Sequence, residues 1–330
     1  MCQRGEVSLE DSGMLFHGGK DMDTLCVNAL QKSFGTKEVL KGVSFAVPKN
    51  CVFGFIGCNG AGKTTTMKAV LGLLKADAGE ILVEGERVLY GNTKTNRFIG
   101  YLPDVPEFYG YMTAREYLKL CADITEIPKN EQKARTEELL ELVGLKDEKH
   151  RIHGYSRGMK QRLGIAQALL HKPKLLICDE PTSALDPAGR KEILDILSTA
   201  KQETTVLFST HILSDVERIC DRVAMLHEGR IVLSGTMEEL RERKGEAGIL
   251  VAARSQADRD RLWEHFPDMK PYESGGEPYA LYRPTASEES FRQVLQTVAE
   301  QGIAIDKAER MEPSLEDIFL GITGTKEETR

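Results

Sequence analysis

The sequence has no apolar run long enough to cross a membrane, for which about 20 consecutive apolar residues are needed. It also lacks an N-terminal basic segment followed by an apolar one, the pattern of a secretory leader. We therefore expect the protein in the cytosol. Its seven cysteines are scattered, with no C-x-x-C pair and no clustered histidines, so the sequence indicates neither a disulfide framework nor a zinc site.

An excess of positive charge is absent as well. The formal net charge is −7, and residues 231–330 account for all of it, with 13 Lys and Arg against 20 Asp and Glu. The first 230 residues carry 31 basic and 31 acidic side chains. Nucleic-acid binding requires a basic surface, so we expect no nucleic acid as a partner.

The pattern along the chain predicts three parts. Residues 1–21 are polar and aperiodic, which predicts a disordered tail. The "GGKD" before Met22 could also be encoded by a bacterial ribosome-binding sequence, so a natural start at Met22 is a second hypothesis. Over residues 22–238, short β-rich runs alternate with helical stretches, as in an α/β fold with parallel strands, and helices dominate about 104–155. Residues 239–330 have the order strand, helix, strand, helix, strand, which predicts a small C-terminal α+β domain.

The segment "GCNGAGKTT" fits the phosphate-loop pattern G-x-x-x-x-G-K-[ST], directly after an apolar strand and before a helical run. Glycines let backbone N–H groups surround phosphate oxygens, and the following helix adds the positive end of its dipole. The lysine neutralises β- and γ-phosphate oxygens, and the threonine hydroxyl can bind Mg²⁺. The pattern therefore predicts a nucleotide with Mg²⁺, the alternative being a glycine-rich turn without a ligand. The predicted nucleotide-binding residues are Gly57, Cys58, Asn59, Gly60, Ala61, Gly62, Lys63, Thr64 and Thr65.

Cys58 lies inside this loop, next to the start of the predicted helix. A helix N-terminus makes a nearby thiol more reactive. We therefore expect alkylation of Cys58 to block nucleotide binding and bound ATP to protect the thiol, and an unreactive thiol is the alternative.

A second segment that contains candidate catalytic residues is "KLLICDEPTSALD", in which an apolar strand ends in Asp179 and Glu180. Open α/β sheets bind their ligands at strand ends. Asp179 is suited to the outer coordination shell of Mg²⁺, and Glu180, ionised at neutral pH, can take a proton from the water that attacks the γ-phosphorus. His211, at the end of the next apolar strand, can hydrogen-bond the γ-phosphate or that water. The alternatives are two solvated surface acids and a structural histidine.

These motifs, in this order, resemble those of the ATPase subunit of ATP-binding-cassette (ABC) transporters, over about Leu25 to Gly235. Between them lies "YSRGMKQRL", which is similar to the serine- and glycine-containing signature of the family, usually LSGGQ. The leucine, first-glycine and glutamine positions differ, whereas the serine and second glycine match. The resemblance implies that the signature touches the phosphate held by the opposite subunit of a dimer. The matching residues are Tyr155, Ser156, Arg157, Gly158 and Met159.

The resemblance also implies roles for single residues. Phe34 occupies the position of an aromatic ring that stacks on adenine, usually a tyrosine. Ser183 to Asp186 match the loop that links the two sites across the dimer. Asp104 stands where the family has a glutamine that contacts Mg²⁺. Because aspartate is one methylene shorter, we expect Asp104 to act through a water and Asp104→Gln to keep ATPase activity.

As a fold, the resemblance implies an α/β P-loop NTPase core with an antiparallel β subdomain and a helical subdomain, followed by the C-terminal accessory domain. As a function, it implies a subunit that forms a homodimer, or a heterodimer with a second cassette, around two ATP with Mg²⁺ and drives a separate polytopic permease at the inner face of the cell membrane. Phe108, Tyr109 and Tyr111 either pack in the core or form the floor of a groove that receives a permease helix.

The signature and the final "MEPSLEDIFLGITG" are similar to the branch that works with type-2 exporter permeases. Export is therefore expected, of a drug, antibiotic, lipid, polysaccharide or ion, and the permease selects the substrate. The alternative function is a soluble ABC ATPase that acts on ribosomes or DNA. Such proteins usually carry tandem cassettes, coiled-coil insertions or zinc motifs, none of which this sequence contains.

Overall fold

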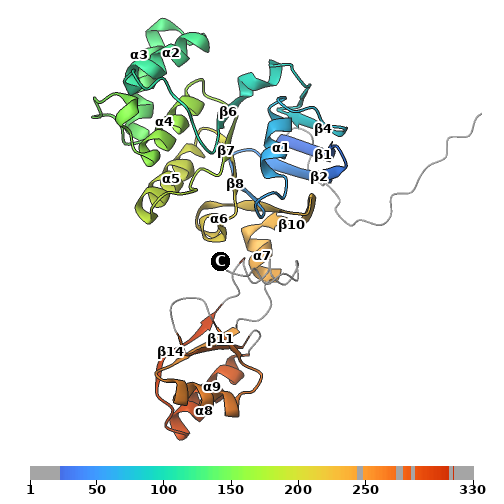
Figure 1. Ribbon diagram of the computed structural model, residues 1–330, viewed down its shortest axis with the longest axis vertical. Coiled ribbons are helices and arrows are strands. Elements are labelled where there is room, and N and C mark those ends of the chain that lie inside the picture. Colours follow the sequence, from blue (N-terminus) through green and yellow to red (C-terminus); the bar gives the residue numbers. More distant parts are fainter. Residues whose placement is uncertain (1–22, 244–247, 273–277, 284–286, 312–314, 316–330) are drawn as a thin grey trace, which may run out of the picture. The chain divides into compact units, whose positions relative to one another are not determined.

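Figure 1 shows the fold in a computed structural model. The expected tail, the alternative start at Met22 and most of "MEPSLEDIFLGITG" lie outside the residues that the structure describes. The described residues are 23–243, 248–272, 278–283, 287–311 and 315.

Contacts within the chain group it into two compact units. The first spans Met1–Cys51 and Thr64–Phe208, and the second spans Val52–Lys63 and Ser209–Arg330. The second unit therefore contains the phosphate-loop glycines together with the C-terminal third of the chain.

The first unit contains a four-stranded antiparallel sheet with the order β2-β1-β4-β5. In β2, Val43, Phe45 and Val47 are buried and alternate with more exposed residues, as in a sheet with one face on a core. This sheet confirms the predicted antiparallel β subdomain. Its strands are β1 (Asp23–Phe34), β2 (Lys37–Pro48), β4 (Ala78–Val83) and β5 (Glu86–Arg87).

The predicted parallel strands belong to a six-stranded sheet with the order β10-β9-β3-β8-β7-β6. β3 pairs with β9 and β6 with β7 in parallel, whereas β10 is antiparallel to β9. Every residue of β3, β7 and β8 is buried, as expected of strands covered on both faces. Because β6 and β7 are parallel, the loops that follow them leave the same edge of the sheet. The strands are β3 (Val52–Ile56), β6 (Ile99–Leu102), β7 (Leu175–Asp179), β8 (Thr205–Thr210), β9 (Arg222–His227) and β10 (Arg230–Thr236).

Helices α2 and α3 lie inside the segment where the sequence predicts helices. α2 begins with a capping box, in which Thr113 accepts from the backbone N–H of Glu116 and the Glu116 carboxylate accepts from that of Thr113. Its buried Tyr117 and Leu118 lie on one face, so local capping and burial both favour this helix. The helices up to residue 243 are α1 (Lys63–Val70), α2 (Ala114–Ile124), α3 (Lys129–Leu142), α4 (Arg157–Leu169), α5 (Pro187–Ala200), α6 (Leu213–Ile219) and α7 (Met237–Arg243), with 3-10 helices η1 (Lys94–Phe98) and η2 (Ile152–Gly154).

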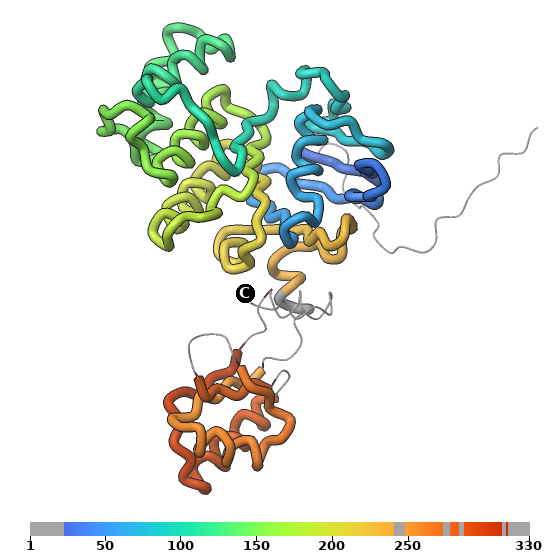
Figure 2. The backbone as a smooth tube through the Cα atoms, viewed as in Figure 1, coloured from blue at the N-terminus to red at the C-terminus, as the bar shows by residue number. Residues whose placement is uncertain are grey.

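The C-terminal part forms a βαββαβ domain with its own antiparallel sheet, of order β12-β13-β11-β14 (Figure 2, orange to red). Ile249 and Val251 of β11, Leu262 of α8 and Val294 of α9 are buried together in its core. The predicted α+β domain is confirmed, and the structure adds the short strand β12. The elements are β11 (Gly248–Ala253), α8 (Gln256–His265), β12 (Lys270–Pro271), β13 (Ala280–Arg283), α9 (Glu288–Glu300) and β14 (Ile305–Met311).

Candidate nucleotide-binding site

The phosphate-loop segment leaves the buried strand β3 and enters α1 at Lys63. Gly57 lies where a side chain has no room, because a Cβ there would come 2.5 Å from the backbone oxygen of Leu226. Gly60 and Gly62 have φ angles of +83° and +113°, which residues with a side chain rarely adopt. The glycines therefore allow the tight backbone path from which N–H groups bind phosphate at a helix start.

Lys63 is 6% exposed, and its ammonium lies within the loop. Nζ donates to the backbone oxygen of Gly57 at 2.5 Å and to that of Cys58 at 3.4 Å. Cys58 is half-buried, Asn59 is exposed and Ala61 is buried. The structure thus holds the positive charge among the backbone groups that the sequence predicts to bind phosphate.

Thr64, the second residue of α1, is bonded to the acidic end of β7. Its Oγ1 donates to Oδ2 of Asp179 at 2.8 Å, and Asp179 is 3% exposed; Thr65, next in the helix, is half-buried. Hydroxyl and carboxylate oxygens are ligands that Mg²⁺ prefers, usually one or two from the protein beside phosphates and waters, so these residues fit the metal. Among the described residues, no group of three or more His, Cys, Asp or Glu side chains is placed to hold a metal ion.

Glu180 follows Asp179 in a strained backbone conformation. Its φ is +48°, the left-handed region, which costs a non-glycine residue on the order of 1–3 kcal/mol and persists only where the surroundings hold it. The backbone N–H of Ser183 donates to the backbone oxygen of Glu180 at 3.1 Å and closes a turn. Asp186 then caps α5 by accepting from the backbone N–H of Gly189 at 3.2 Å. The turn therefore fixes the backbone of Glu180 at the strand end, and its side chain is partly exposed.

Two side chains near Asp179 have raised pKa values. Burial, and after it the charge of Asp179, raises the pKa of Tyr101 to about 12. The same two causes raise the pKa of the Cys178 thiol. Both groups stay protonated at neutral pH and add no negative charge beside Asp179.

His211 and Phe34 are exposed side chains at strand ends. His211 follows β8, where the backbone N–H of Ile212 donates to Oγ1 of Thr210 at 3.0 Å and turns the chain. Phe34 ends β1 with 50% of its surface exposed, and Nζ of Lys32 lies 5.3 Å from its ring centroid. An exposed ring can stack on a base, so Phe34 is accessible for the predicted contact. For both residues the contact with ATP stays a prediction.

The signature segment forms the start of α4. Ser156 is its N-cap, and Oγ accepts from the backbone N–H of Met159 at 3.2 Å. Tyr155 is buried and anchors the segment, whereas Ser156 is exposed. A Cβ on Gly158 would meet a single neighbouring atom within 4 Å, at 3.9 Å. The positive end of this helix is therefore open to solvent and can bind an anion.

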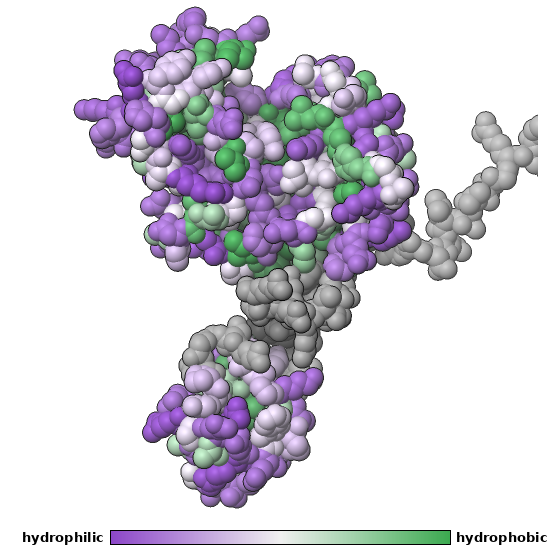
Figure 3. All heavy atoms as spheres, viewed as in Figure 1, coloured by the Kyte–Doolittle hydropathy of each residue, from purple (hydrophilic) through white to green (hydrophobic). Residues whose placement is uncertain are grey.

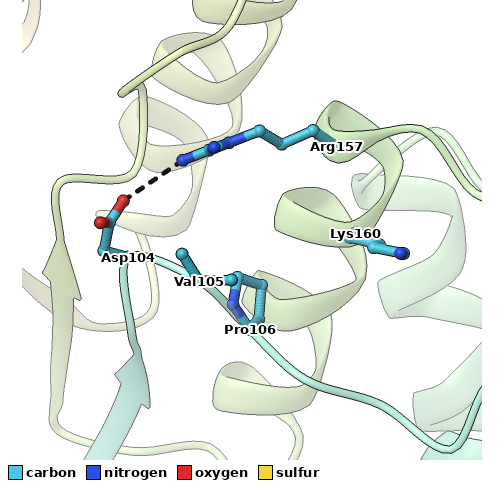
Figure 4. Close-up of a pocket in the computed structure, with 5 residues that line it drawn as sticks. All are labelled: Asp104, Val105, Pro106, Arg157 and Lys160. Carbon is cyan, nitrogen blue, oxygen red and sulfur yellow. Dashed lines mark hydrogen bonds and ion pairs between the residues drawn. The ribbon is translucent and has the colours of Figure 1, made fainter.

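Three predicted site residues from different segments meet in the first unit. Oδ1 of Asp104, after β6, accepts from Oγ of Ser183 at 2.6 Å. The same oxygen accepts from Nη2 of Arg157, in α4, at 3.5 Å, and Figure 4 shows this pair. Nε2 of the buried Gln161 donates to the backbone oxygen of Asp104 at 2.7 Å. Sequence reasoning missed both this link and Gln161, because no spacing pattern marks contacts between residues that are 79 and 57 positions apart.

The fold and this geometry define the class of protein. A phosphate loop between a strand and a helix, whose threonine is bonded to an acidic strand end, is the nucleotide-binding arrangement of a P-loop ATPase. The chain is similar to the solved "Structure of ATP binding subunit of ABC transporter", with 34% identity, a TM-score of 0.61, and 67% of this chain and 92% of that chain covered. The predicted P-loop ABC ATPase fold is therefore confirmed.

The family described as "ABC transporter" matches residues 40–183. The chain is 39% identical over 307 residues to "Uncharacterized ABC transporter ATP-binding protein YxlF" of Bacillus subtilis (strain 168), with 90% of this chain and 99% of that protein covered. It is 37% identical over 299 residues to "Bacitracin transport ATP-binding protein BcrA" of Bacillus licheniformis, with 89% and 95% covered. The chain thus belongs to the family of ABC transporter ATP-binding proteins. In the part of the chain that the structure describes, no helix is long and apolar enough to cross a membrane.

Proposed function

We propose that the protein is the ATP-hydrolysing subunit that drives a separate membrane permease for export. The observation that carries this is the hydrogen bond of 2.8 Å between Thr64 and Asp179, which joins the phosphate-loop helix to the acidic strand end. These two residues would hold Mg²⁺, which when bound neutralises phosphate charge. Glu180 follows directly in the chain, so the same strand end supplies a base for the transfer of the γ-phosphoryl group to water.

The chain's own groups account for the binding and hydrolysis of ATP. Backbone N–H groups of residues 57–65 and the ammonium of Lys63 bind the phosphates, and the ring of Phe34 stacks on adenine. Glu180 takes the proton of the attacking water. His211 hydrogen-bonds the γ-phosphate or that water and orients the nucleophile. Glu180, Lys63 and His211 are thus the catalytic residues of the proposal.

The exposed start of α4 supports a dimer. Ser156 and the first-turn N–H groups form an anion site, yet the chain has a separate phosphate loop. We therefore propose that Ser156, Arg157, Gly158 and Met159 bind the phosphate held by the other subunit, in a homodimer or a heterodimer with a second cassette. Ser183 and Asp186 lie in the loop that links the two sites.

A surface of the first unit suits a permease helix. A hollow of about 350 Å³ is lined by the loop after β6 and by η2, and includes Val105 and Phe108. Phe108 packs edge-on against Tyr117, with ring centroids 5.1 Å apart, whereas Tyr109 and Tyr111 are 55% and 64% exposed. Figure 3 shows patches of apolar side chains on a mostly hydrophilic surface of the molecule. Exposed apolar side chains beside a hollow, as at Val105, are typical of interaction sites. An amphipathic helix of the permease, at the inner face of the membrane, fits such a surface.

The proposal that the protein serves an exporter is supported by the signature segment and by the relative that is named for bacitracin transport. We propose a drug, antibiotic, lipid, polysaccharide or ion as the exported substrate, selected by the permease. We further propose that residues 22–238 form the ATPase domain, with the helical subdomain at about 104–155. Residues 239–330 form an accessory domain that assists dimerisation or regulates closure.

The test uses the wild-type chain and Glu180→Gln. Wild type should hydrolyse ATP only with Mg²⁺, and Glu180→Gln should lower the rate on the order of 100-fold or more while it keeps ATP binding and forms an ATP-dependent dimer in light scattering. Glu126→Gln is the control: it removes the same charge at another residue with a positive φ, +57°, and its ATPase rate should equal that of wild type. Affinity purification from membranes should yield a polytopic membrane protein, and recovery of ribosomes alone would establish the alternative function.

A further inference from the structure

The backbone of Asp104 is held firmly by α4. Gln161, which is fully buried, donates from Nε2 to the backbone oxygen of Asp104 at 2.7 Å. On the same helix, a Cβ on Gly164 would lie 2.5 Å from Cδ1 of Leu102 and 3.4 Å from Cβ of Pro106. The loop after β6 therefore passes closely over α4 on both sides of Asp104, which gives its side chain a defined starting point.

The carboxylate of Asp104 makes one strong and one weak contact. Oδ1 accepts from the Ser183 hydroxyl at 2.6 Å, which is at the short end of the range for O–H···O hydrogen bonds. Nη2 of Arg157 lies 3.5 Å from the same oxygen and 3.4 Å from Oγ of Ser183, and both charged side chains are about half exposed, so this ion pair contributes little. Ser183 is therefore the principal partner of Asp104.

Ser183 carries the contact on to Glu180. The Ser183 hydroxyl donates to the carboxylate of Asp104, and the backbone N–H of Ser183 donates to the backbone oxygen of Glu180 at 3.1 Å. Glu180 has a φ of +48° and precedes Pro181. A residue before proline has few allowed conformations, and a left-handed one persists only where its surroundings hold it. The Asp104–Ser183 bond is placed to supply that restraint.

We propose that Asp104 is a positioning residue for ATP hydrolysis, which holds the Glu180 turn in its strained conformation through Ser183. This rests on the proposed function, in which Glu180 is the general base. The carboxylate of Asp104 acts by accepting the Ser183 hydrogen bond and not by binding the metal. Arg157 joins the start of α4 to the same link, so the three segments that carry Asp104, Glu180 and the signature are connected within one subunit.

Variants at this link can be made without disturbing the core. The side chain of Asp104 is 49% exposed and borders a hollow of about 210 Å³ (Figure 4). Asp104→Asn keeps an oxygen that can accept from Ser183, whereas Asp104→Ala and Ser183→Ala each remove the bond. Glu107→Gln, which removes one negative charge from the same loop, is the matched control.

The experiment measures kcat, KM for ATP and the Mg²⁺ concentration for half-maximal activity. Asp104→Ala and Ser183→Ala should each lower kcat roughly three- to tenfold with KM and the Mg²⁺ requirement unchanged. The double variant should be no slower than the slower single variant, because both remove one interaction. Asp104→Asn should return kcat to within about twofold of wild type, and Glu107→Gln should equal wild type. The inference would be overturned if the two single losses of kcat multiplied in the double variant. An unchanged kcat in Asp104→Ala, or a raised Mg²⁺ requirement in that variant, would also overturn it.

A second measurement does not depend on hydrolysis. The backbone N–H of Ser183 donates to the backbone oxygen of Glu180. Its hydrogen should exchange with solvent faster in Asp104→Ala than in wild type or Glu107→Gln. Equal exchange would refute the positioning role even if the protein hydrolyses ATP. Conversely, faster exchange together with a Glu180→Gln variant of wild-type activity would overturn the proposed function and leave the link itself established.

Discussion

Replacing Ser156 by aspartate separates the two roles assigned to the start of α4. In the subunit, Ser156 is an N-cap whose Oγ accepts from the backbone N–H of Met159 at 3.2 Å. In the proposed dimer, the same group faces the γ-phosphate bound to the other subunit. Aspartate preserves the first role and reverses the second, so Ser156→Asp should lose hydrolysis without losing stability.

The magnitudes can be worked out for each role. Loss of the cap in Ser156→Ala costs about 1 kcal/mol, which lowers Tm by about 2–4 °C in a domain of this size. Aspartate caps as well as serine, and its charge at a helix N-terminus adds about 0.3–1 kcal/mol, so Ser156→Asp should be at least as stable as wild type. A carboxylate about 4 Å from a phosphate charge costs about 4 kcal/mol at an effective dielectric constant of 20. Dimer closure should therefore weaken roughly 1000-fold.

The assay compares ATPase rate, ATP binding by the monomer and Tm. Ser156→Asp should lose hydrolysis and ATP-dependent dimerisation but keep ATP affinity, with a Tm no lower than that of wild type. Ser287→Asp is the matched control, because Ser287 caps α9 with the same distance of 3.2 Å to the backbone N of Ser290, and it should hydrolyse ATP normally. Hydrolysis by Ser156→Asp within about twofold of wild type, or an equal loss of binding and hydrolysis, would refute the reasoning.

Three further predictions concern the phosphate loop and Tyr101, a residue of β6 near Asp179. Gly57→Ala should abolish ATP binding in a fluorescent-nucleotide titration, because its Cβ would lie 2.5 Å from the Leu226 oxygen, whereas Gly154→Ala, with no atom within 4 Å, should bind normally. Alkylation of Cys58 should block ATP binding, and bound ATP should slow the modification in mass spectrometry; full ATPase activity after alkylation would contradict this. Because the pKa of Tyr101 is raised to about 12, its contribution to stability is complete below about pH 10 and is lost as pH rises toward 12. Tyr101→Phe should flatten the fall of unfolding free energy in that range, and an unchanged slope would contradict the assignment.

The features predicted from sequence are those that depend on residues close along the chain. The phosphate-loop glycines are needed for the backbone path of nine consecutive residues, Gly57 to Thr65. The N-cap of α4 is a bond between Ser156 and the residue three positions later. The C-terminal domain follows from the alternation of apolar patterns, although the two-residue strand β12 is too short to leave such a pattern.

Strand order could not be predicted in the same way. The sequence indicates buried parallel strands, but it does not indicate that β3 lies between β9 and β8, or that β6 is an edge strand. Apolar strands that are buried on both faces carry no alternation that would assign them to particular neighbours. Their pairing is chosen by the packing of the whole sheet.

The sequence alone therefore determined the family resemblance, the chemistry of the phosphate loop and the identity of the acids at the strand end. Only the tertiary structure decided that Asp104, which the sequence suggested as a ligand of Mg²⁺ through a water, is bonded to Ser183. The physical reason is that β6 and β7 pair in parallel, so their following loops leave one edge of the sheet, where α4 holds the first of them in place through Gln161. A contact between residues 79 positions apart exists only once those strands and that helix have packed together.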